Sequence, residues 1–374
     1  MEIEIGIGKT GRRAYGFDEV AIVPSRRTRD PDDVDISWEI DAWTFSLPMM
    51  ASAMDWEVSP ATSVEIGGLG GLAVLNLEGL WTRYEDPEPI FDEIAGLSDE
   101  KATGRMQELY REPIKEELVG RRIREIKEGG AVAAGSLTPQ RVRTYADLVL
   151  EAELDVLVIQ GTVVSAEHVS TRTEPLNLKQ FIYELDVPVI VGGCATYTAA
   201  LHLMRTGAAG VLVGFGGGSG HTTAAVLGVA VPMATAIADV AAARREYLDE
   251  SGGRYVHVIA DGGMTRSGDI AKALACGADA VMVGSPFARA EQAPGRGYHW
   301  GSESHHPDLP RGARVQVGTI GTLEQILHGP STVADGQLNL VGALRRTMAT
   351  SGYSDLKEFQ RVEVVVTSSA PPKR

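Results

Sequence analysis

The stretch GVLVGFGGGSGHTT occupies residues 210–223 and joins a short apolar run to a glycine-rich loop. Residues 211–213 are continuously apolar, as in a buried strand, and five glycines follow before the His-Thr-Thr cluster at 221–223. A plain strand-to-helix turn needs one or two glycines, so we expect this loop to bring its backbone close to a ligand. The loop lacks the third glycine of a Gly-x-Gly-x-x-Gly pattern and the Gly-Lys-Ser/Thr of a P-loop, so it matches neither nucleotide fingerprint.

Eight short apolar runs of this kind recur along the chain. They cover residues 47–52, 69–75, 131–134, 155–159, 187–191, 210–213, 256–260 and 279–283. Each run is continuously apolar rather than alternating, which is typical of parallel strands covered on both faces. Helical segments separate most of them, and Gly207 and Gly277 stand where left-handed helix caps are expected. The pattern predicts an α/β protein with a (β/α)8 TIM barrel, and a doubly wound open sheet is the alternative.

Polar or glycine-rich clusters follow nearly every predicted strand on its carboxyl side. They lie at residues 52–55, 160–162, 192–194, 216–223, 261–263 and 284–285. In a barrel these clusters all meet at one face, whereas in an open sheet they would spread along an edge. A shared mouth lined by small and polar residues is the usual ligand site of a barrel, and this favours the barrel over the open sheet.

We expect one barrel domain over residues 1–366 and a disordered tail at 367–374. The segment 17–24 is predicted to be an ordered lead-in, and residues 36–45 to form a hairpin outside the main core. Residues 80–127 are rich in Glu, Arg and Lys and are predicted to be a solvated helical insertion after the second strand. Residues 291–316 lack periodicity, so we expect a long flap loop of the kind that closes over a site.

The composition sets limits on partners and compartment. The chain has 374 residues, 44% of them hydrophobic, and a net charge of −15. Such an excess of acidic residues argues against nucleic acid or an anionic membrane as a partner, so any phosphate must be held locally. The two cysteines make no disulfide framework, and there is no secretion signal and no run of about 18 apolar residues, so a cytoplasmic protein is expected.

Asp261-Gly262-Gly263 directly follows a predicted buried strand. An aspartate at the carboxyl end of a barrel strand points into the mouth, where the two hydroxyls of a sugar can donate to it. Gly262 and Gly263 expose backbone amides, and Gly284 and Ser285 offer the same one strand later, with a hydroxyl. The loops after strands seven and eight are the usual phosphate cradle of a barrel. Ser285 is equally well explained as the cap of the next helix, a position that also suits a phosphate.

Taken together, the motifs resemble those of the IMP dehydrogenase / GMP reductase family. The resemblance rests on residues 48–55, 67–70, 214–223, 236–240, 258–263, 281–285 and 341–345, in order along the chain. It implies a (β/α)8 barrel, usually a homotetramer, that binds a purine nucleoside monophosphate (IMP, XMP or GMP) beside a nicotinamide cofactor. Dehydrogenases of the family oxidise IMP to XMP with NAD, and reductases convert GMP to IMP with NADPH. The CBS domains of many family dehydrogenases are absent, and residues 80–127 stand where they would be inserted.

The resemblance assigns roles to individual residues. It implies that Asp261 holds the ribose hydroxyls and that Ser52 and Met54 line the nucleotide pocket. The phosphate would be held by Ser219, Gly263, Gly284 and Ser285. Backbone carbonyls of Gly216, Gly218 and His221 match the family's monovalent cation site, so K⁺ is a possible cofactor, beside NAD or NADP.

Four departures from the family pattern concern the chemistry. His221 stands where the family has its nucleophilic cysteine, while Thr223, two residues on, remains. An imidazole there can attack the purine, act as a base toward water, or mark lost chemistry, and a plain loop histidine is equally compatible. On the cofactor side, Gln160 replaces an aspartate and Cys194 an asparagine; Cys194 as a substitute nucleophile is the less favoured reading.

The fourth departure lies in the flap, where the family pairs an arginine with a tyrosine to activate water. Arg296, Tyr298, Arg311 and Arg314 are in that region without the family's spacing. His299, His305 and His306 add three more polar residues, but their spacing supports no metal site.

We therefore expect a purine-nucleotide oxidoreductase that resembles IMP dehydrogenase and uses NAD. A GMP reductase with NADPH is one alternative, because it needs no activated water. A catalytically impaired nucleotide-binding relative is another, because each known activity relies on the loop cysteine. A different reaction on a related nucleotide also fits the residues.

Overall fold

The computed structural model describes residues 2–171, 175–215, 217–218, 220–306 and 314–367. Eight parallel strands close into a barrel, each hydrogen-bonded to the next around the ring. They are β6 (Met49–Ala51), β7 (Leu72–Asn76), β8 (Ala134–Leu137), β9 (Val156–Gln160), β10 (Val189–Cys194), β11 (Gly210–Val213), β12 (His257–Asp261) and β13 (Ala280–Val283). The predicted (β/α)8 TIM barrel is confirmed, and each predicted run contains or overlaps its strand.

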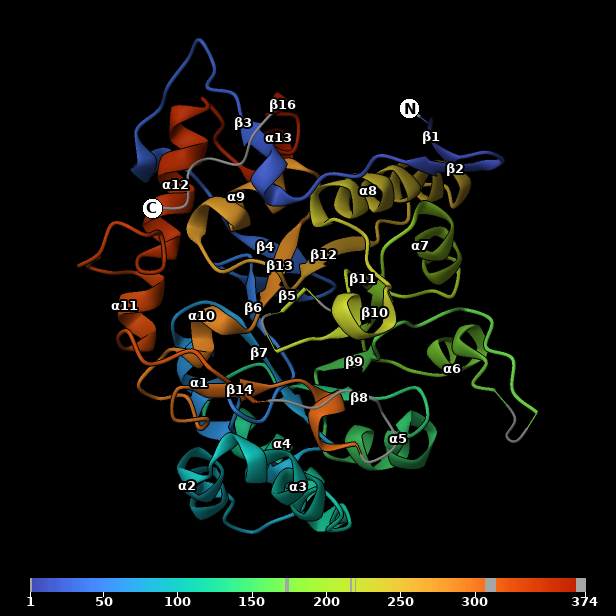
Figure 1. The fold of residues 1–374 in the computed structure, drawn as a ribbon, viewed down its shortest axis with the longest axis vertical. Helices are drawn as coiled ribbons and strands as arrows, with labels where there is room; N and C mark the ends of the chain where they lie inside the picture. The colour runs from blue at the N-terminus through green and yellow to red at the C-terminus, as the bar shows by residue number, and fades with distance from the viewer. Residues whose placement is uncertain (1, 172–174, 216, 219, 307–313, 368–374) are drawn as a thin grey trace.

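The helices that return the chain between strands form the outer ring seen in Figure 1. They are α1 (Pro60–Gly68), α4 (Glu116–Glu128), α5 (Val142–Glu151), α6 (Leu178–Tyr183), α7 (Tyr197–Met204), α8 (Met233–Glu250) and α9 (Ser267–Ala275). After β13 follow α10 (Ser285–Ala288), α11 (Leu323–Leu327), α12 (Leu340–Thr350) and α13 (Leu356–Phe359). Gly207 and Gly277 have φ values of +98° and +115°, the left-handed conformation expected of residues that end a helix. None of the helices in the described ranges combines the length and the apolarity needed to cross a membrane.

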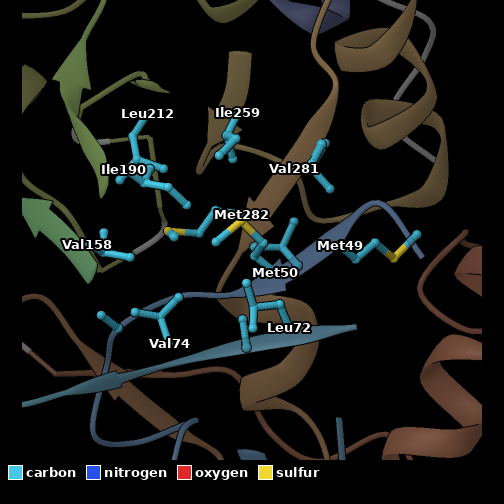
Figure 2. Close-up of a cluster of buried hydrophobic side chains, with 14 of the residues drawn as sticks. Met49, Met50, Leu72, Val74, Val158, Ile190, Leu212, Ile259, Val281 and Met282 are labelled. Atoms are coloured by element: carbon cyan, nitrogen blue, oxygen red, sulfur yellow. The ribbon is translucent and has the colours of Figure 1, made fainter. Parts of the chain in front are cut away.

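The barrel interior is filled by apolar side chains, as Figure 2 shows. Met50 and Met282 are register partners on β6 and β13, both fully buried, and lie side by side in this cluster. Val74, Ile190 and Leu212 reach it from other strands and are equally buried. Full burial of so many branched and flexible apolar side chains provides the main hydrophobic stabilisation, about 1.5–3 kcal/mol for each. The barrel is therefore a packed core, and ligand space is left only at its ends.

The amino-terminal part of the chain covers the bottom of the barrel. The predicted hairpin is present as β4 (Trp38–Ile40) and β5 (Trp43–Phe45). The prediction that it lies outside the core is wrong, because Trp38, Ile40 and Phe45 are buried within it. The Trp38 indole lies 3.3 Å from Nδ1 of His257, the first residue of β12, so the hairpin closes the amino end of the strands.

The two ends of the described chain are tied together. The predicted lead-in contains the 3₁₀ turn η1 (Phe17–Glu19) and β3 (Val20–Ile22), which pairs antiparallel with β16 (Val364–Val366). An exposed hairpin of β1 (Glu2–Gly6) and β2 (Lys9–Arg12) precedes it. Most of the predicted tail, residues 368–374, lies outside the described residues.

The segment 80–127 is helical as predicted, but it is not simply solvated. It contains η3 (Leu80–Thr82), α2 (Glu88–Gly96), α3 (Asp99–Leu109) and α4. α4 packs between α1 and α5 and is one of the barrel's own helices. α2 and α3 form a separate lobe at the edge of the barrel mouth, the cyan and teal helices of Figure 1. Their buried faces carry Phe91, Ile94 and Met106.

The flap contains ordered structure rather than a plain loop. The antiparallel pair β14 (Tyr298–Trp300) and β15 (Arg314–Gln316) flanks the turn η5 (Ser302–His305). η5 and β15 pack against α3, so the flap rests on the helical lobe.

Candidate active site at the barrel mouth

A cavity of about 720 Å³ opens at the carboxyl ends of the barrel strands. Its lining comes from the loops after β6, β7, β8, β9, β11, β12 and β13, together with α3 and the flap. Of the residues assigned by sequence, Ser52, Met54, Gln160, Gly218, His221, Asp261, Gly263, Gly284 and Ser285 line it. The predicted convergence of the strand ends at one mouth therefore holds in the structure.

A second depression of similar volume lies on the outside, between α6 and α7. Its two arginines are already engaged: Arg205 pairs with Glu250, and Arg254 donates to the Gly207 carbonyl. This depression lies away from the strand ends, so the barrel mouth is the stronger candidate site.

Asp261 ends β12, and its carboxylate stands at the mouth. The Gln160 amide, from the end of β9, donates to Oδ2 of Asp261 over 3.1 Å. Burial raises the pKa of Asp261 to about 6, although the charge of His221 and the Gln160 hydrogen bond oppose the shift. The second carboxylate oxygen remains as an acceptor for ligand hydroxyls. Gln160, predicted as a cofactor residue, is thus also a direct partner of the predicted ribose-binding residue.

Gly217, in the loop after β11, allows close approach to the loop after β12. A Cβ on Gly217 would lie 3.1 Å from the Gly263 amide nitrogen, which is tighter than ordinary packing allows. Gly262 and Gly263 both have positive φ, near +77°, a conformation that favours glycine. The glycines were predicted to let the backbone approach a ligand, and here they pack the loops after β11 and β12 against each other.

Ser52, at the end of β6, is fixed by a buried carboxylate. Its amide and its hydroxyl both donate to Oε1 of Glu57, the hydroxyl over 3.1 Å. Burial raises the pKa of Glu57 well above its usual range, although the two Ser52 hydrogen bonds oppose the shift. A Cβ on Gly284 would lie 3.2 Å from the Ser52 hydroxyl. The loops after β6 and β13 therefore meet, and Ser52 stands beside Gly284 and Ser285.

Ser285 is the first residue of α10, and Gly284 is the capping residue. The alternative interpretation of Ser285 as the cap of this helix is therefore wrong, because the cap is Gly284 and no side-chain cap hydrogen bond is formed. Gly216 and Ser219, predicted for the cation and phosphate sites, lie outside the described residues. The Gly218 carbonyl, predicted as a cation ligand, accepts the His221 amide over 2.9 Å in a tight turn.

His221 lines the cavity between two titratable partners. The charge of His221 acts to lower the pKa of Asp261 on one side and that of His299 on the other. His299 is buried in the flap and packs against Trp56 with ring centroids 4.8 Å apart. Burial lowers the pKa of His299 to about 4, and nearby His221 lowers it further, so His299 is neutral at pH 7. In this arrangement His221 can accept a proton, and the neutral His299 beside it can share that proton.

Thr223 and Cys194 lie behind the cavity wall rather than among the described residues that line it. Thr223 is fully buried at the start of the short π-helix η4 (Thr223–Leu227). The Cys194 thiol donates to the Leu212 carbonyl, 3.5 Å away, and burial raises its pKa to about 12. A thiol held protonated in this way is a poor nucleophile, so the structure gives no support to Cys194 in that role.

The flap residues singled out by sequence bind the helical lobe. Arg296 pairs with Glu88 and Asp92 of α2, at 2.6 and 2.9 Å. Arg314 donates to the carbonyls of Ile94 and Leu97, and its guanidinium lies 4.2 Å from the Tyr298 ring centre. Arg296 and Arg314 therefore hold the flap on the helical lobe, and neither is among the described residues that line the cavity. Arg311 lies outside the described residues.

Sequence reasoning missed the contribution of the helical lobe to the site. Gln107, Tyr110 and Arg111, at the end of α3, line the cavity. The Tyr110 hydroxyl donates to Oδ2 of the buried Asp55 over 2.6 Å and accepts from the Trp300 indole over 3.0 Å. The signal was present, because Met106, Leu109 and Tyr110 repeat at helical spacing and mark a buried face.

Fold and site together define a barrel protein whose mouth holds a half-buried carboxylate beside glycine loops after strands seven and eight, as in nucleotide-binding barrels. Comparison with known proteins gives the family. The model of the IMP dehydrogenase / GMP reductase domain matches residues 14–306, and the chain belongs to this family. The family predicted from the sequence is confirmed.

Individual relatives agree with this assignment. An uncharacterized oxidoreductase of Mycolicibacterium smegmatis is 52% identical over 98% of this chain and all of its own. The inosine-5′-monophosphate dehydrogenase of Haemophilus influenzae is 43% identical over 66% of this chain and 51% of its own. A crystal structure of an IMP dehydrogenase/GMP reductase-like protein from Corynebacterium glutamicum is 50% identical, with a TM-score of 0.93 over 98% of both chains.

Proposed function

We propose that this protein oxidises IMP to XMP and passes the hydride to a nicotinamide dinucleotide, with NAD as the first candidate. The balanced reaction takes IMP, NAD⁺ and water to XMP, NADH and a proton. The observation that carries the proposal is Asp261, a half-buried carboxylate at the end of β12 that faces the same cavity as the glycine loops 262–263 and 284–285. A ribose monophosphate offers a diol for the carboxylate and a phosphate for the backbone amides.

The residues assigned by the sequence have the following roles in this proposal. Asp261 accepts from the ribose hydroxyls, and the backbone of Gly263 and Gly284 holds the phosphate with Ser285 and Ser219. Ser52 and Met54 border the purine. Gln160 keeps Asp261 in place through its amide and borders the space for the nicotinamide.

His221 acts as the general base in the proposed reaction. It takes a proton from water, and the water oxygen bonds to C2 of the purine. A bound nicotinamide dinucleotide would accept the hydride that C2 gives up. The proton then passes to solvent, directly or through neutral His299. This route needs no thiolate, consistent with histidine at position 221 and with the buried, protonated Cys194. Thr223, behind His221, supports the loop.

The remaining expectations belong to the same proposal. The cavity has space for a second ligand beside the nucleotide, and NAD or NADP would supply the hydride acceptor there. A K⁺ ion on the carbonyls of Gly216, Gly218 and His221 would hold the loop. We further propose a homotetramer that acts in the cytoplasm.

A second candidate is reduction of GMP, in which GMP, NADPH and two protons give IMP, NADP⁺ and ammonium. One observation favours it. Arg296 and Arg314 are bound to the helical lobe, and neither is among the described residues that line the cavity, so neither is placed to activate water there. A nucleotide-binding relative without turnover is the third candidate, favoured by the missing loop cysteine.

The test is an assay of IMP with NAD⁺ in potassium buffer, following reduced nicotinamide, for the natural protein and His221→Cys. Turnover by the natural protein that disappears in His221→Ala supports the base mechanism. Activity only in His221→Cys refutes it and favours the binding protein. Inactivity of both proteins, with turnover of GMP and NADPH, would establish the reductase instead.

A further inference from the structure

Glu57 is a buried carboxyl group directly behind the wall of the barrel mouth. It is 1% exposed and is not among the described residues that line the cavity. A Cβ on Gly284 would lie 3.3 Å from Oε2 of Glu57 and 3.2 Å from the Ser52 hydroxyl, and both Gly284 and Ser52 line the cavity. Glu57 therefore stands just behind the wall at Gly284, where the proposed nucleotide places its phosphate.

The two side-chain oxygens of Glu57 have different surroundings. Oε1 accepts the amide and the hydroxyl of Ser52, the hydroxyl over 3.1 Å. Oε2 is buried and has no hydrogen-bond partner in the described part of the chain. An ionised carboxylate needs donors at both oxygens, so leaving one of them buried and unpaired has a free-energy cost that a neutral acid largely avoids. The surroundings of Glu57 therefore favour its neutral form.

The charges around Glu57 act in the same direction. Asp261, at the end of β12, is the charged group that acts on Glu57, and like burial it raises the pKa of Glu57. His299 packs on the neighbouring Trp56 and is neutral at pH 7, so it supplies no positive charge. A phosphate bound beside Gly284 would bring further negative charge to this end of the cavity and would favour the neutral acid again.

The protonation of Glu57 decides which way the hydrogen bond between Glu57 and the Ser52 hydroxyl runs. When Glu57 is ionised, the single hydroxyl proton of Ser52 points at Oε1, and Ser52 turns only lone pairs toward the cavity. When Oε1 carries a proton, Glu57 can donate it to Oγ of Ser52, and the Ser52 hydroxyl is released to donate to a ligand. A fully ionised phosphate offers only acceptors, so it can bind the Ser52 hydroxyl in the second state and not in the first.

We propose that Glu57 is a positioning residue of the nucleotide site, which must be uncharged for Ser52 to donate to the phosphate, so that nucleotide binding takes up a proton at Glu57. The inference rests on the proposed function, since it takes the ligand beside Gly284 to be a nucleoside monophosphate. The coupling is reciprocal, because protonation of Glu57 strengthens phosphate binding and bound phosphate strengthens proton binding to Glu57. The affinity for IMP therefore falls as the pH rises and Glu57 ionises.

The test is calorimetric titration with IMP in buffers of different ionisation enthalpy, repeated between about pH 6 and about pH 9, which counts the protons taken up on binding. Glu57→Gln keeps the shape of the neutral acid and carries no charge, so its proton uptake should be smaller than that of the natural protein by up to about one proton. Its affinity for IMP should equal that of the natural protein at the low end of the range and exceed it severalfold at the high end. The phosphate and Asp261 exchange protons in both proteins, so the difference reports Glu57. Glu151→Gln is the matched control, because Glu151 is exposed on α5 and outside the described cavity lining.

Inosine, which lacks the phosphate, should bind the natural protein without this uptake, and that comparison needs no variant. Equal uptake by the natural protein and Glu57→Gln refutes the inference, and so does an uptake with inosine as large as with IMP. Either result leaves the proposed oxidoreductase intact. Failure of IMP to bind at all refutes the proposed nucleotide site together with this inference, so the two failures are distinguishable.

Discussion

The ring of Tyr110, at the end of α3, stacks on the ring of His305 in the flap, with centroids 3.6 Å apart and planes 2° from parallel. The Tyr110 hydroxyl also joins the Trp300 indole of the flap to the Asp55 carboxylate below the cavity. One side chain thus connects the helical lobe, the flap and the loop after β6. This contact adds to the ion pairs and hydrogen bonds by which Arg296 and Arg314 hold the flap on the helical lobe.

We predict that Tyr110→Ala loosens the flap while the barrel stays folded. Removing the ring abolishes the stack and both hydrogen bonds, and leaves Asp55 with one partner fewer in a buried setting. Hydrogen exchange of residues 298–306 should rise at least tenfold. Tyr110→Phe keeps the stack and should give an intermediate increase.

Tyr183→Ala is the control for the flap, because Tyr183 is exposed on α6 and away from the mouth. Exchange in the flap that is the same in Tyr110→Ala and in the natural protein would show that other contacts hold it. The arginines of the flap, Arg296 and Arg314, would then be the next residues to test.

The second prediction concerns nucleotide affinity. Asp261→Ala removes the acceptor of the proposed ribose hydrogen bonds and also the partner of the Gln160 amide. Hydrogen bonds to a charged group contribute about 1.5–3 kcal/mol each, so the affinity for IMP should fall about 100-fold. Calorimetric titration measures this, with Asp147→Ala on the exposed face of α5 as the control. An unchanged dissociation constant would remove Asp261 from the site.

The pH dependence of binding follows from the same carboxylate. The pKa of Asp261 is raised to about 6, chiefly by burial, so the group is ionised at pH 7.5 and mostly protonated at pH 5. Protonation removes acceptor capacity toward the ribose, and the affinity for IMP should fall as the pH drops through about 6. The phosphate of IMP titrates in the same range, but its contribution is common to all variants. The ratio of dissociation constants between Asp261→Asn and the natural protein should therefore rise with pH and level off above pH 7, and a flat ratio would contradict the prediction.

Much of the fold could be predicted because barrel strands carry a strong local signal. The runs at 210–213 and 279–283 are short, apolar and bounded by glycine, and each contains its observed strand. The placing of Asp261 and Gly284 at one mouth followed from topology alone. The contact between Gln160 and Asp261 did not, because the residues are 101 positions apart and meet only across the closed barrel.

The helical lobe shows a different limit. Its many charged residues suggested a solvated insertion, yet the three-dimensional fold sets Tyr110 and Arg111 into the cavity wall. The composition of a helical segment averages over its buried and its exposed faces, whereas only the buried face contributes residues to the site. The position of the hairpin at 38–45 could not be predicted either. Its alternating pattern shows that one face is buried, but not which surface of the barrel that face covers.

The last prediction concerns stability at the opposite end of the barrel. Asp279, before β13, is fully buried; it pairs with Arg244 and Lys357, both at 2.6 Å, and accepts the Val258 amide over 2.8 Å. Burial alone would raise the pKa of Asp279, but Arg244 and Lys357 outweigh it and hold the pKa below its usual value. Because the folded pKa is the lower one, this stabilisation is present above the unfolded pKa of about 3.9 and is lost as the pH falls below it.

Asp279→Asn leaves a buried arginine without its counter-charge and should lower the free energy of unfolding at pH 7 by about 3–5 kcal/mol, measured by urea denaturation. The difference from the natural protein should shrink toward pH 3, and IMP affinity at pH 7 should not change, because Asp279 lies at the amino end of the strands. A loss below about 0.5 kcal/mol, against Asp147→Asn as the control, would show that the surrounding hydrogen bonds hold this end of the barrel without the charge.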